Sequence, residues 1–180
     1  MTDFGSYHVT VIQELNLEAL LHTYGPALIR FAYSITGSTA AAEDAMEDAL
    51  AILILKGGRF KNEHQLRAWL YKTTRSRAVD YLRRHAHETP LSDVEAVLEC
   101  CDLEETLVMR ERNRMLYLCV RELPVQYRQV LQLHYLDGFD IGMICRILGK
   151  TKKQVYNLLS RAKSDLKEKL IQEGISYEDI

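Results

Sequence analysis

The chain has 180 residues, of which 47% are hydrophobic and 27% charged, and its formal net charge is −2. That size fits one compact domain or two small ones, and so small a net charge argues, taken alone, against a nucleic-acid-binding protein. The start of the chain has no basic segment followed by an apolar run, which argues against a signal peptide. The longest strongly apolar run, residues 49–55, is too short to cross a bilayer, so we expect a cytoplasmic protein without membrane insertion.

The charges are distributed unevenly along the chain. Residues 58–87 carry eight Lys and Arg against two acids, whereas residues 88–106 carry seven acids and no Lys or Arg. Residues 1–57 are also acidic, and residues 107–180 have a net charge of +4. Two basic blocks separated by an acidic strip indicate two nucleic-acid contacts joined by a linker.

Helical periodicity dominates the amino-terminal half. We expect a first helix from about residue 12 to residue 36, with a candidate bend at Pro26. Gly37 then breaks the pattern, and Ser38 or Thr39 can cap a second helix over residues 39–56. This second helix is acidic in its first turns and apolar near its end.

A basic amphipathic helix is expected over about residues 63–85, after a short loop at residues 59–62. Its apolar stripe contains Leu66, Trp69, Leu70, Thr73, Val79 and Leu82. Its polar side offers Arg67, Lys72, Arg75, Arg77, Arg83 and Arg84. Because Trp69 falls on the apolar stripe, a core position is favoured over stacking on a base.

The second half begins with a stretch at residues 87–105 that we interpret as a linker, because it combines a proline with seven acids. Helices are expected over residues 107–122 and 124–137, with Pro124 in a first helical position and Gly138 as the stop.

Residues 140–170 have the pattern of a helix-turn-helix with a basic second helix. Asp140 can cap a short helix that Gly149 ends in the left-handed conformation, and Thr151 with Gln154 forms a capping box for the next helix. The buried side of that helix is expected at Val155, Leu158, Leu159, Ala162 and Leu166. Its other side carries Lys152, Lys153, Gln154, Tyr156, Asn157, Ser160, Arg161 and Lys163. Such a face could contact phosphates and base edges in a major groove, and the alternative is an ordinary solvated charged face.

No pattern of catalytic or metal-binding residues is apparent. The six histidines form no HExxH motif, the four cysteines form no Cys-x-x-Cys pair, and no glycine-rich phosphate loop is present. We therefore expect no enzyme activity, no metal and no cofactor, and we expect Cys119 and Cys145 to be core thiols.

Several motifs follow one another along the chain. The first half contains AAEDAMEDAL at 41–50, RF at 59–60, LRAWLY at 66–71 and RSRAVDYLRR at 75–84, and this series resembles region 2 of bacterial RNA polymerase sigma factors. The second half contains LPVQYRQVL at 123–131, YLDG at 135–138 and the helix-turn-helix, and this series resembles region 4 of the same family. Only these two regions are matched, and this layout resembles the extracytoplasmic-function (ECF) group.

The resemblance implies an all-α fold of two small helical domains, a region 2 bundle and a region 4 helix-turn-helix. The implied boundaries are a tail at 1–12, region 2 at 13–87, an acidic linker at 88–106, region 4 at 107–172 and a tail at 173–180.

The resemblance also assigns partners to individual positions. In the family, the acidic helix of region 2 docks on a coiled coil of the polymerase's largest subunit, and the polymerase flap is a further contact. The matching positions here are Asp44, Glu47, Asp48, Leu50 and Leu53. The alternative for the leucines is a place in the core. The family often has an aromatic residue where Leu50 stands.

The loop and basic helix match the part of the family that opens the −10 promoter element. Candidate contacts to unstacked bases are Phe60, Lys61, Asn62, Glu63 and His64, and candidate phosphate contacts are Arg75, Arg77, Arg83 and Arg84. Asp80 is expected to orient an arginine. The basic face of the second helix in the helix-turn-helix matches the reader of the −35 element, where Gln154 and Asn157 could pair with adenine and Arg161 with guanine or phosphate.

The leading hypothesis is a sigma factor that binds core RNA polymerase and directs promoter-specific transcription initiation, while the polymerase performs the catalysis. The resemblance also implies an anti-sigma factor as a partner. The acidic linker could let the two domains fold around that partner, or it could compete with the partner for the basic faces of the domains. The alternative is a stand-alone dimeric helix-turn-helix regulator of transcription. That alternative assigns no function to the acidic helix at 39–56 or to the basic helix at 63–85.

Overall fold

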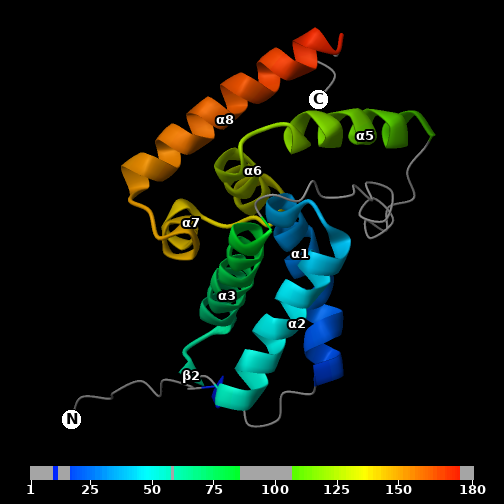
Figure 1. The fold of residues 1–180 in the computed structure, drawn as a ribbon. Helices are drawn as coiled ribbons and strands as arrows, with labels where there is room; N and C mark the ends of the chain where they lie inside the picture. The colour runs from blue at the N-terminus through cyan, green and yellow to red at the C-terminus, as the bar shows by residue number, and fades with distance from the viewer. Residues whose placement is uncertain (1–9, 12–16, 58, 86–106, 175–180) are drawn as a thin grey trace.

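The computed structural model describes residues 10–11, 17–57, 59–85 and 107–174, and the predicted linker at 88–106 lies outside this part of the chain. Helices make up nearly all of the described residues, which confirms the all-α prediction (Figure 1). They are α1 Leu17–Thr36, α2 Thr39–Lys56, α3 Glu63–Arg84, α5 Leu107–Arg121, α6 Val125–Leu131, α7 Ile141–Leu148 and α8 Lys152–Gln172. None of the helices in the described ranges is long and apolar enough to cross a membrane.

Helices α1, α2 and α3 pack against one another as an amino-terminal bundle. The Ser38 side chain caps α2 by accepting a hydrogen bond from the amide of Ala41, as expected. Asn62 caps α3 in the same way through the amide of Gln65, at 3.0 Å. Helix α1 continues through Pro26 as one element, and the predicted start of this helix lies outside the described residues.

A short antiparallel pair of strands, β1 Thr10–Val11 and β2 Arg59–Phe60, was not predicted. It places part of the expected loop at residues 59–62 in a strand directly before α3. Two-residue strands carry almost no hydrophobic pattern, which explains why periodicity did not indicate them.

The carboxy-terminal half differs from the prediction at one point. The expected continuous helix over residues 124–137 is instead α6 followed by a π-helix, η1 Gln132–Leu136. The wider turn changes which side chains face inward: Leu133 is fully buried, whereas Tyr135 and Leu136 are 52% and 73% exposed. Such π-helical turns often occur at functional sites.

The helix-turn-helix forms as the sequence predicted. Asp140 accepts a hydrogen bond from the amide of Met143, and Gly149 ends α7 with a left-handed φ of 65°. Thr151 and Gln154 make both hydrogen bonds of the capping box at the start of α8. Of the predicted inner face, Val155, Leu159 and Ala162 are buried, and Leu158 and Leu166 are half-buried.

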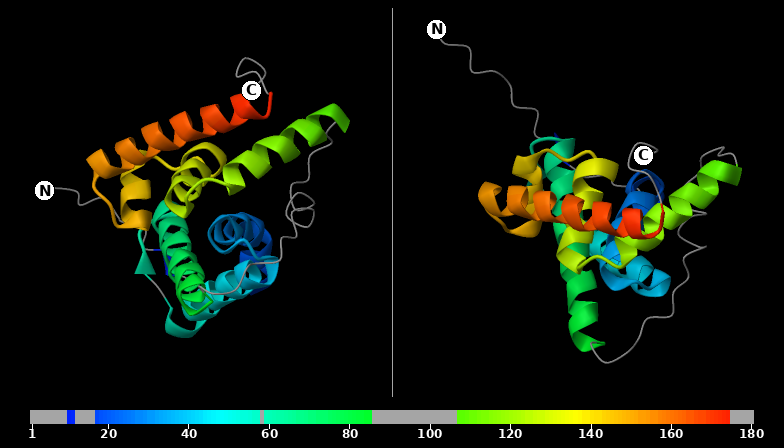
Figure 2. Two further views of the ribbon diagram at one scale, coloured as in Figure 1. Left: turned by 45° about the horizontal axis from the view of Figure 1, so that its top comes forward. Right: turned by 90° about the horizontal axis from the view of Figure 1, so that it is seen from above.

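The two halves of the molecule share one hydrophobic core. Helix α6 packs against α1, and α7 packs against α3, as the two views in Figure 2 show. The Phe139 ring, from the turn between η1 and α7, lies edge-on to Tyr71 of α3 with ring centroids 4.8 Å apart. Buried side chains from both halves therefore form a single continuous cluster.

Candidate nucleic-acid and polymerase interfaces

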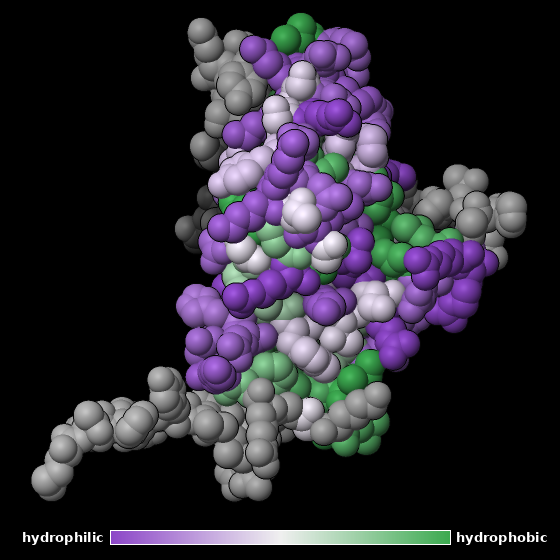
Figure 3. All heavy atoms as spheres, turned by 90° about the vertical axis from the view of Figure 1, so that its left-hand side faces the viewer, coloured by the Kyte–Doolittle hydropathy of each residue, from purple (hydrophilic) through white to green (hydrophobic). Residues whose placement is uncertain are grey.

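The predicted recognition face of α8 lies on the surface. All eight of its predicted residues are exposed: Lys152, Lys153, Gln154, Tyr156, Asn157, Ser160, Arg161 and Lys163. The ammonium of Lys163 also lies 5.2 Å from the centroid of the Tyr135 ring. Figure 3 views the molecule from the side of α7 and the start of α8, where hydrophilic side chains cover most of the upper half.

Two amides on this face differ in what they can offer a base. The Oε1 atom of Gln154 accepts hydrogen bonds from the backbone amide of Thr151 at 2.8 Å and from its hydroxyl at 3.2 Å. Bidentate recognition of adenine needs the oxygen and the nitrogen of one amide together. Gln154 can therefore offer only its nitrogen while the capping box holds. Asn157 is exposed and makes no side-chain hydrogen bond to the described residues, so its whole amide is available.

Most of the candidate −10 loop is exposed beside the start of α3. Lys61, Asn62, Glu63 and His64 are all exposed. Phe60 differs from the expectation, because it is only 8% exposed and its ring packs edge-on against Trp69 at 5.9 Å between centroids. In this arrangement Phe60 and the half-buried Trp69 form an apolar support behind the loop rather than a surface open to bases.

Three of the four candidate phosphate contacts on α3 are exposed and held only weakly. Arg77 lies 3.7 Å from Asp48, and Arg83 lies 3.6 Å from Asp80. Arg84 donates to the backbone oxygen of Asp80 at 3.3 Å. Exposed pairs of this kind contribute little, so these arginines could exchange their partners for phosphates at small cost.

Arg75, the fourth candidate, is held by the other half of the molecule. Its Nε donates to Oε1 of Gln129 in α6 at 2.9 Å, and Gln129 is only 3% exposed. Burial, with the nearby charge of Arg83, lowers the pKa of Arg75 from its ordinary value. Sequence reasoning missed Gln129, because it lies 54 residues from Arg75 and no local pattern links them.

The acidic face of α2 is exposed at Asp44, Glu47 and Asp48, as expected for a protein interface. Leu50 and Leu53 do not belong to that face: each is 1% exposed and packs in the core. Residues three apart lie on the same side of a helix, and this side faces the bundle.

The apolar side chains at the surface of α2 come from its last turn instead. Ile54 and Leu55 are 43% and 83% exposed. Leu55 follows Asp44 and Asp48 at helical spacing, so all three share a face. The structure therefore places an apolar edge beside the carboxylates, but with other residues than the sequence indicated.

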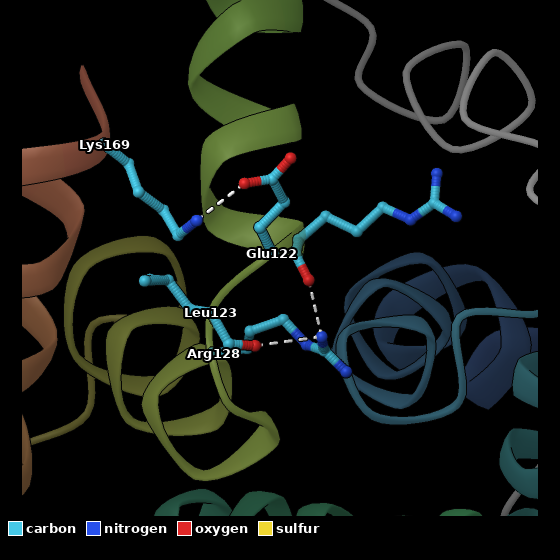
Figure 4. A network of polar contacts seen from close by, with 5 residues as sticks. Glu122, Leu123, Arg128 and Lys169 are labelled. Atoms are coloured by element: carbon cyan, nitrogen blue, oxygen red, sulfur yellow. Dashed lines mark hydrogen bonds and ion pairs between the residues drawn. The ribbon is translucent and has the colours of Figure 1, made fainter. Parts of the chain in front are cut away.

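Arg128 was not predicted as a functional residue, yet it bridges the two halves. Its guanidinium donates to the backbone oxygens of Arg121 at 2.7 Å and Leu123 at 3.1 Å, both near the end of α5 (Figure 4). It also donates to the backbone oxygens of Ser34 at 2.6 Å and Ile35 at 3.4 Å, in the last turn of α1. Ser34, Ile35 and Arg121 lie at the ends of their helices, where carbonyls lack partners within the helix and a cation is favoured. Burial lowers the pKa of Arg128.

A third arginine, Arg67 of α3, contacts the turn that precedes α7. Its Nη2 donates to the backbone oxygen of Asp137 at 3.1 Å, and its guanidinium lies 4.6 Å from the centroid of the Phe139 ring. The Asp137 carboxyl lies in the same place, and burial raises its pKa to about 6 although Tyr71, Gln132, Arg30 and Arg67 all act to lower it.

Comparison with known families agrees with these features. Residues 20–88 match the family model of sigma-70 region 2, and residues 113–166 match that of sigma-70 region 4. We use region 2 and region 4 for these two parts from here on. The chain belongs to the sigma-70 family of RNA polymerase sigma factors, and its relatives place it in the extracytoplasmic-function group.

Individual relatives show moderate similarity. A probable RNA polymerase sigma factor RfaY of Xanthomonas campestris is 29% identical over 78% of this chain and 37% of its own length. The ECF sigma factor SigM of Mycobacterium tuberculosis is 28% identical, covering 83% of this chain and 74% of that protein. SigM of Bacillus subtilis is 23% identical, covering 91% of this chain and 100% of that protein. The chain thus spans about a third of the first of these relatives and most or all of the other two.

A solved structure has the same fold. It is the sigma factor RpoE from Bartonella quintana, crystallised in complex with the anti-sigma factor NepR. The TM-score is 0.62 at 22% identity, and the match covers 85% of this chain and 95% of that one.

Proposed function

We propose that this chain is the promoter-specificity subunit of a bacterial RNA polymerase. In this role it binds core polymerase, opens the −10 element with region 2 and reads the −35 element with region 4. The observation that carries the proposal is the pairing of two faces in one chain: the acidic face of α2 and the basic recognition face of α8 are both exposed. A stand-alone regulator would need only the second face.

The exposed side chains have separate tasks in this proposal. Asp44, Glu47 and Asp48, with Leu55 beside them, meet a basic and apolar surface of the polymerase. Asn157 reads adenine with both atoms of its amide, and Arg161 contacts guanine or phosphate. The chain performs no catalysis itself, since nucleotide transfer belongs to the polymerase.

We also propose an anti-sigma factor as a partner, supported by the RpoE structure, which was crystallised with one. Because the polymerase works in the cytoplasm, the chain is proposed to act there too. Regions 2 and 4 are assigned to residues 13–87 and 107–172. Both begin before the matched residues, and region 4 also ends after them, whereas region 2 ends one residue earlier than its match.

The test is transcription in vitro with bacterial core polymerase, the purified full chain and a pool of promoter fragments. We expect new transcripts that share two spaced upstream elements. Arg161→Ala should abolish or reduce them by tenfold or more, since loss of a good base contact costs about 1–3 kcal/mol. Ser164→Ala, at an exposed position of α8 outside the predicted set, is the matched control. Tight duplex binding without any association with core polymerase would instead favour the dimeric regulator.

A further inference from the structure

The π-helix η1 presents an aromatic ring to the recognition helix α8. Helix α8 packs on α6, and η1 continues α6 directly (Figure 1). The Tyr135 side chain of η1 is 52% exposed, and the ammonium of Lys163 in α8 lies 5.2 Å from the centroid of its ring. An ammonium within about 6 Å of a ring centroid is attracted by the negative face of the ring. Tyr135 therefore interacts, from outside α8, with one of the proposed −35 contacts.

Lys163 lies on the same side of α8 as two other proposed contacts. It follows Ser160 by three residues and Tyr156 by seven, and both spacings bring side chains to one side of a helix. All three side chains are exposed. Base edges are read from the first turns of a recognition helix, so a cation further along α8 is suited to a phosphate of the same duplex.

A lysine loses conformational freedom when it contacts a phosphate. Its four-carbon stem is flexible, so holding the ammonium at one phosphate costs side-chain entropy. A neighbouring carboxylate would restrict the stem, but it would also compete with the phosphate for the charge, as Asp48 does at Arg77. An aromatic face attracts an ammonium without supplying a counter-charge. Tyr135 can thus restrict the stem of Lys163 without itself competing with DNA for the charge.

The local structure of η1 determines where the Tyr135 ring lies. The amide of Asp137 donates to the backbone oxygen of Gln132, five residues earlier, at 3.0 Å, which is the wide turn of a π-helix. This turn leaves Leu133 buried and Tyr135 at the surface. The His134 ring also lies edge-on to the Tyr135 ring, with centroids 4.8 Å apart. Contacts within η1 therefore place the ring beside α8.

We propose that Tyr135 is a positioning residue that holds Lys163 ready for a phosphate of the −35 element. The inference rests on the proposed function, because it requires that α8 binds promoter DNA. It adds a residue outside the helix-turn-helix to those that control promoter affinity. It also gives the π-helix a role, since the wide turn puts the ring next to Lys163.

The experiment measures the affinity of the full chain, bound to core polymerase, for a labelled promoter fragment by fluorescence anisotropy over a range of salt concentrations. Tyr135→Leu removes the aromatic face, and Tyr135→Phe keeps it. Lys163→Met removes the charge and keeps a side chain of similar length. Leu136→Ala, at a more exposed apolar position of η1, is the matched control.

We expect Tyr135→Leu to weaken promoter binding about two- to fivefold, the range of an exposed cation–π contact, and Tyr135→Phe to match wild type. The slope of log affinity against log salt should not change in Tyr135→Leu, because the charge of Lys163 is still present. Lys163→Met should reduce the magnitude of that slope by about 1, as for the loss of one phosphate contact. In the Lys163→Met background Tyr135→Leu should have no further effect, whereas Leu136→Ala should act equally in both backgrounds.

Three results would overturn the proposal. The first is an affinity of Tyr135→Leu equal to that of wild type. The second is an effect of Tyr135→Leu that persists in the Lys163→Met background, because the ring would then act through another contact, such as one with polymerase. The third is an unchanged salt slope in Lys163→Met. In each case wild type still binds the promoter with polymerase, so the proposed function stands. A wild-type chain that binds no promoter in the presence of polymerase would instead refute the proposed function, and the role of Tyr135 falls with it.

Discussion

The two basic helices of this protein, α3 in region 2 and α8 in region 4, differ in how their charges are used. They are similar in length, with 22 and 21 residues, and both were predicted from sequence as nucleic-acid contacts. On α8 all eight predicted residues are exposed. On α3 the arginines are occupied: Arg67 and Arg75 bind region 4, and Arg77, Arg83 and Arg84 bind groups of region 2.

The difference teaches that composition identifies a helix suited to nucleic acid, whereas packing decides when its charges are available. Helix α8 begins at a capping box, and the eight predicted residues of its polar face are exposed. Helix α3 lies between α1, α2 and α7, and part of its basic side is covered. The proposed DNA contacts are therefore more accessible on α8 than on α3.

The largest effect is expected from Arg128→Leu, which removes the link between the ends of α1 and α5. Four backbone oxygens lose their donor, and we expect the free energy of unfolding to fall by about 3 kcal/mol. Urea denaturation followed by circular dichroism measures this, and the single transition should broaden or split as the regions lose their coupling. Arg146→Leu, at an exposed position of α7, should change the midpoint little. Equal midpoints for the two variants would contradict the bridging role.

The second prediction concerns pH and sharpens the comparison at the α3 to α7 contact. Asp137 has its pKa raised to about 6, chiefly by burial, with Tyr71 and Arg67 of α3, Arg30 of α1 and Gln132 of η1 around it. When the chain unfolds, this carboxyl regains solvent and its pKa returns toward 3.8. The folded chain thus binds the proton more tightly than the unfolded one.

The stability that the proton on Asp137 contributes to the folded chain is therefore fully present below about pH 4 and is lost as the pH rises through about 6. Between pH 4.5 and 7.5 this group should lower the free energy of unfolding by about 2 kcal/mol, measured by urea denaturation of the full chain. Asp137→Asn should remove most of this dependence, and Glu168→Gln, at an exposed position of α8, should leave it unchanged. A free energy of unfolding that increases with pH in wild type would show that another group dominates.

The same comparison shows how far the sequence could predict the structure. The caps at Ser38, Asp140 and Thr151 and the left-handed Gly149 depend on neighbours within a few residues, so local patterns sufficed. The recognition face of α8 follows from periodicity alone. The partners of Arg75 and Arg128 lie 54 and up to 94 residues away, and tertiary packing alone brings them together.

Two further misses have local causes. Leu50 and Leu53 were assigned to the polymerase surface from the family resemblance, with a place in the core as the alternative. Because α2 is apolar on nearly every side near its end, hydrophobicity could not show which residues face inward. The π-helix at Gln132–Leu136 was missed because its sequence also fits a regular α-helix. Both errors concern orientation around a helix axis rather than the presence of the helix.

The third prediction separates the two amides on α8. Gln154→Ala breaks the capping box and should lower the free energy of unfolding by about 1 kcal/mol. Asn157→Ala makes no such loss and should stay within about 0.5 kcal/mol of wild type. In promoter binding with polymerase, Asn157→Ala should have the larger effect of the two variants. It should lose about tenfold of the discrimination at one base pair of the −35 element. If Gln154→Ala loses this discrimination and Asn157→Ala keeps it, Gln154 contacts the adenine and the assignment to Asn157 is wrong.

The smallest effect on stability is expected from Asp48→Asn. The ion pair between Asp48 and Arg77 spans 3.7 Å, and the two side chains are 63% and 44% exposed, so its loss should cost less than about 0.5 kcal/mol. The carboxylate nevertheless lies on the face proposed to meet core polymerase, where a complementary charge strengthens association. We therefore expect several-fold weaker polymerase binding at low salt, with the difference shrinking as salt is raised, because exposed charges are screened. Glu168→Gln removes one acid from α8 and should leave that affinity unchanged. If Asp48→Asn binds polymerase like wild type at every salt concentration, the acidic side of α2 is a solvated face, and the exposed Ile54 and Leu55 remain as the part of α2 to test next.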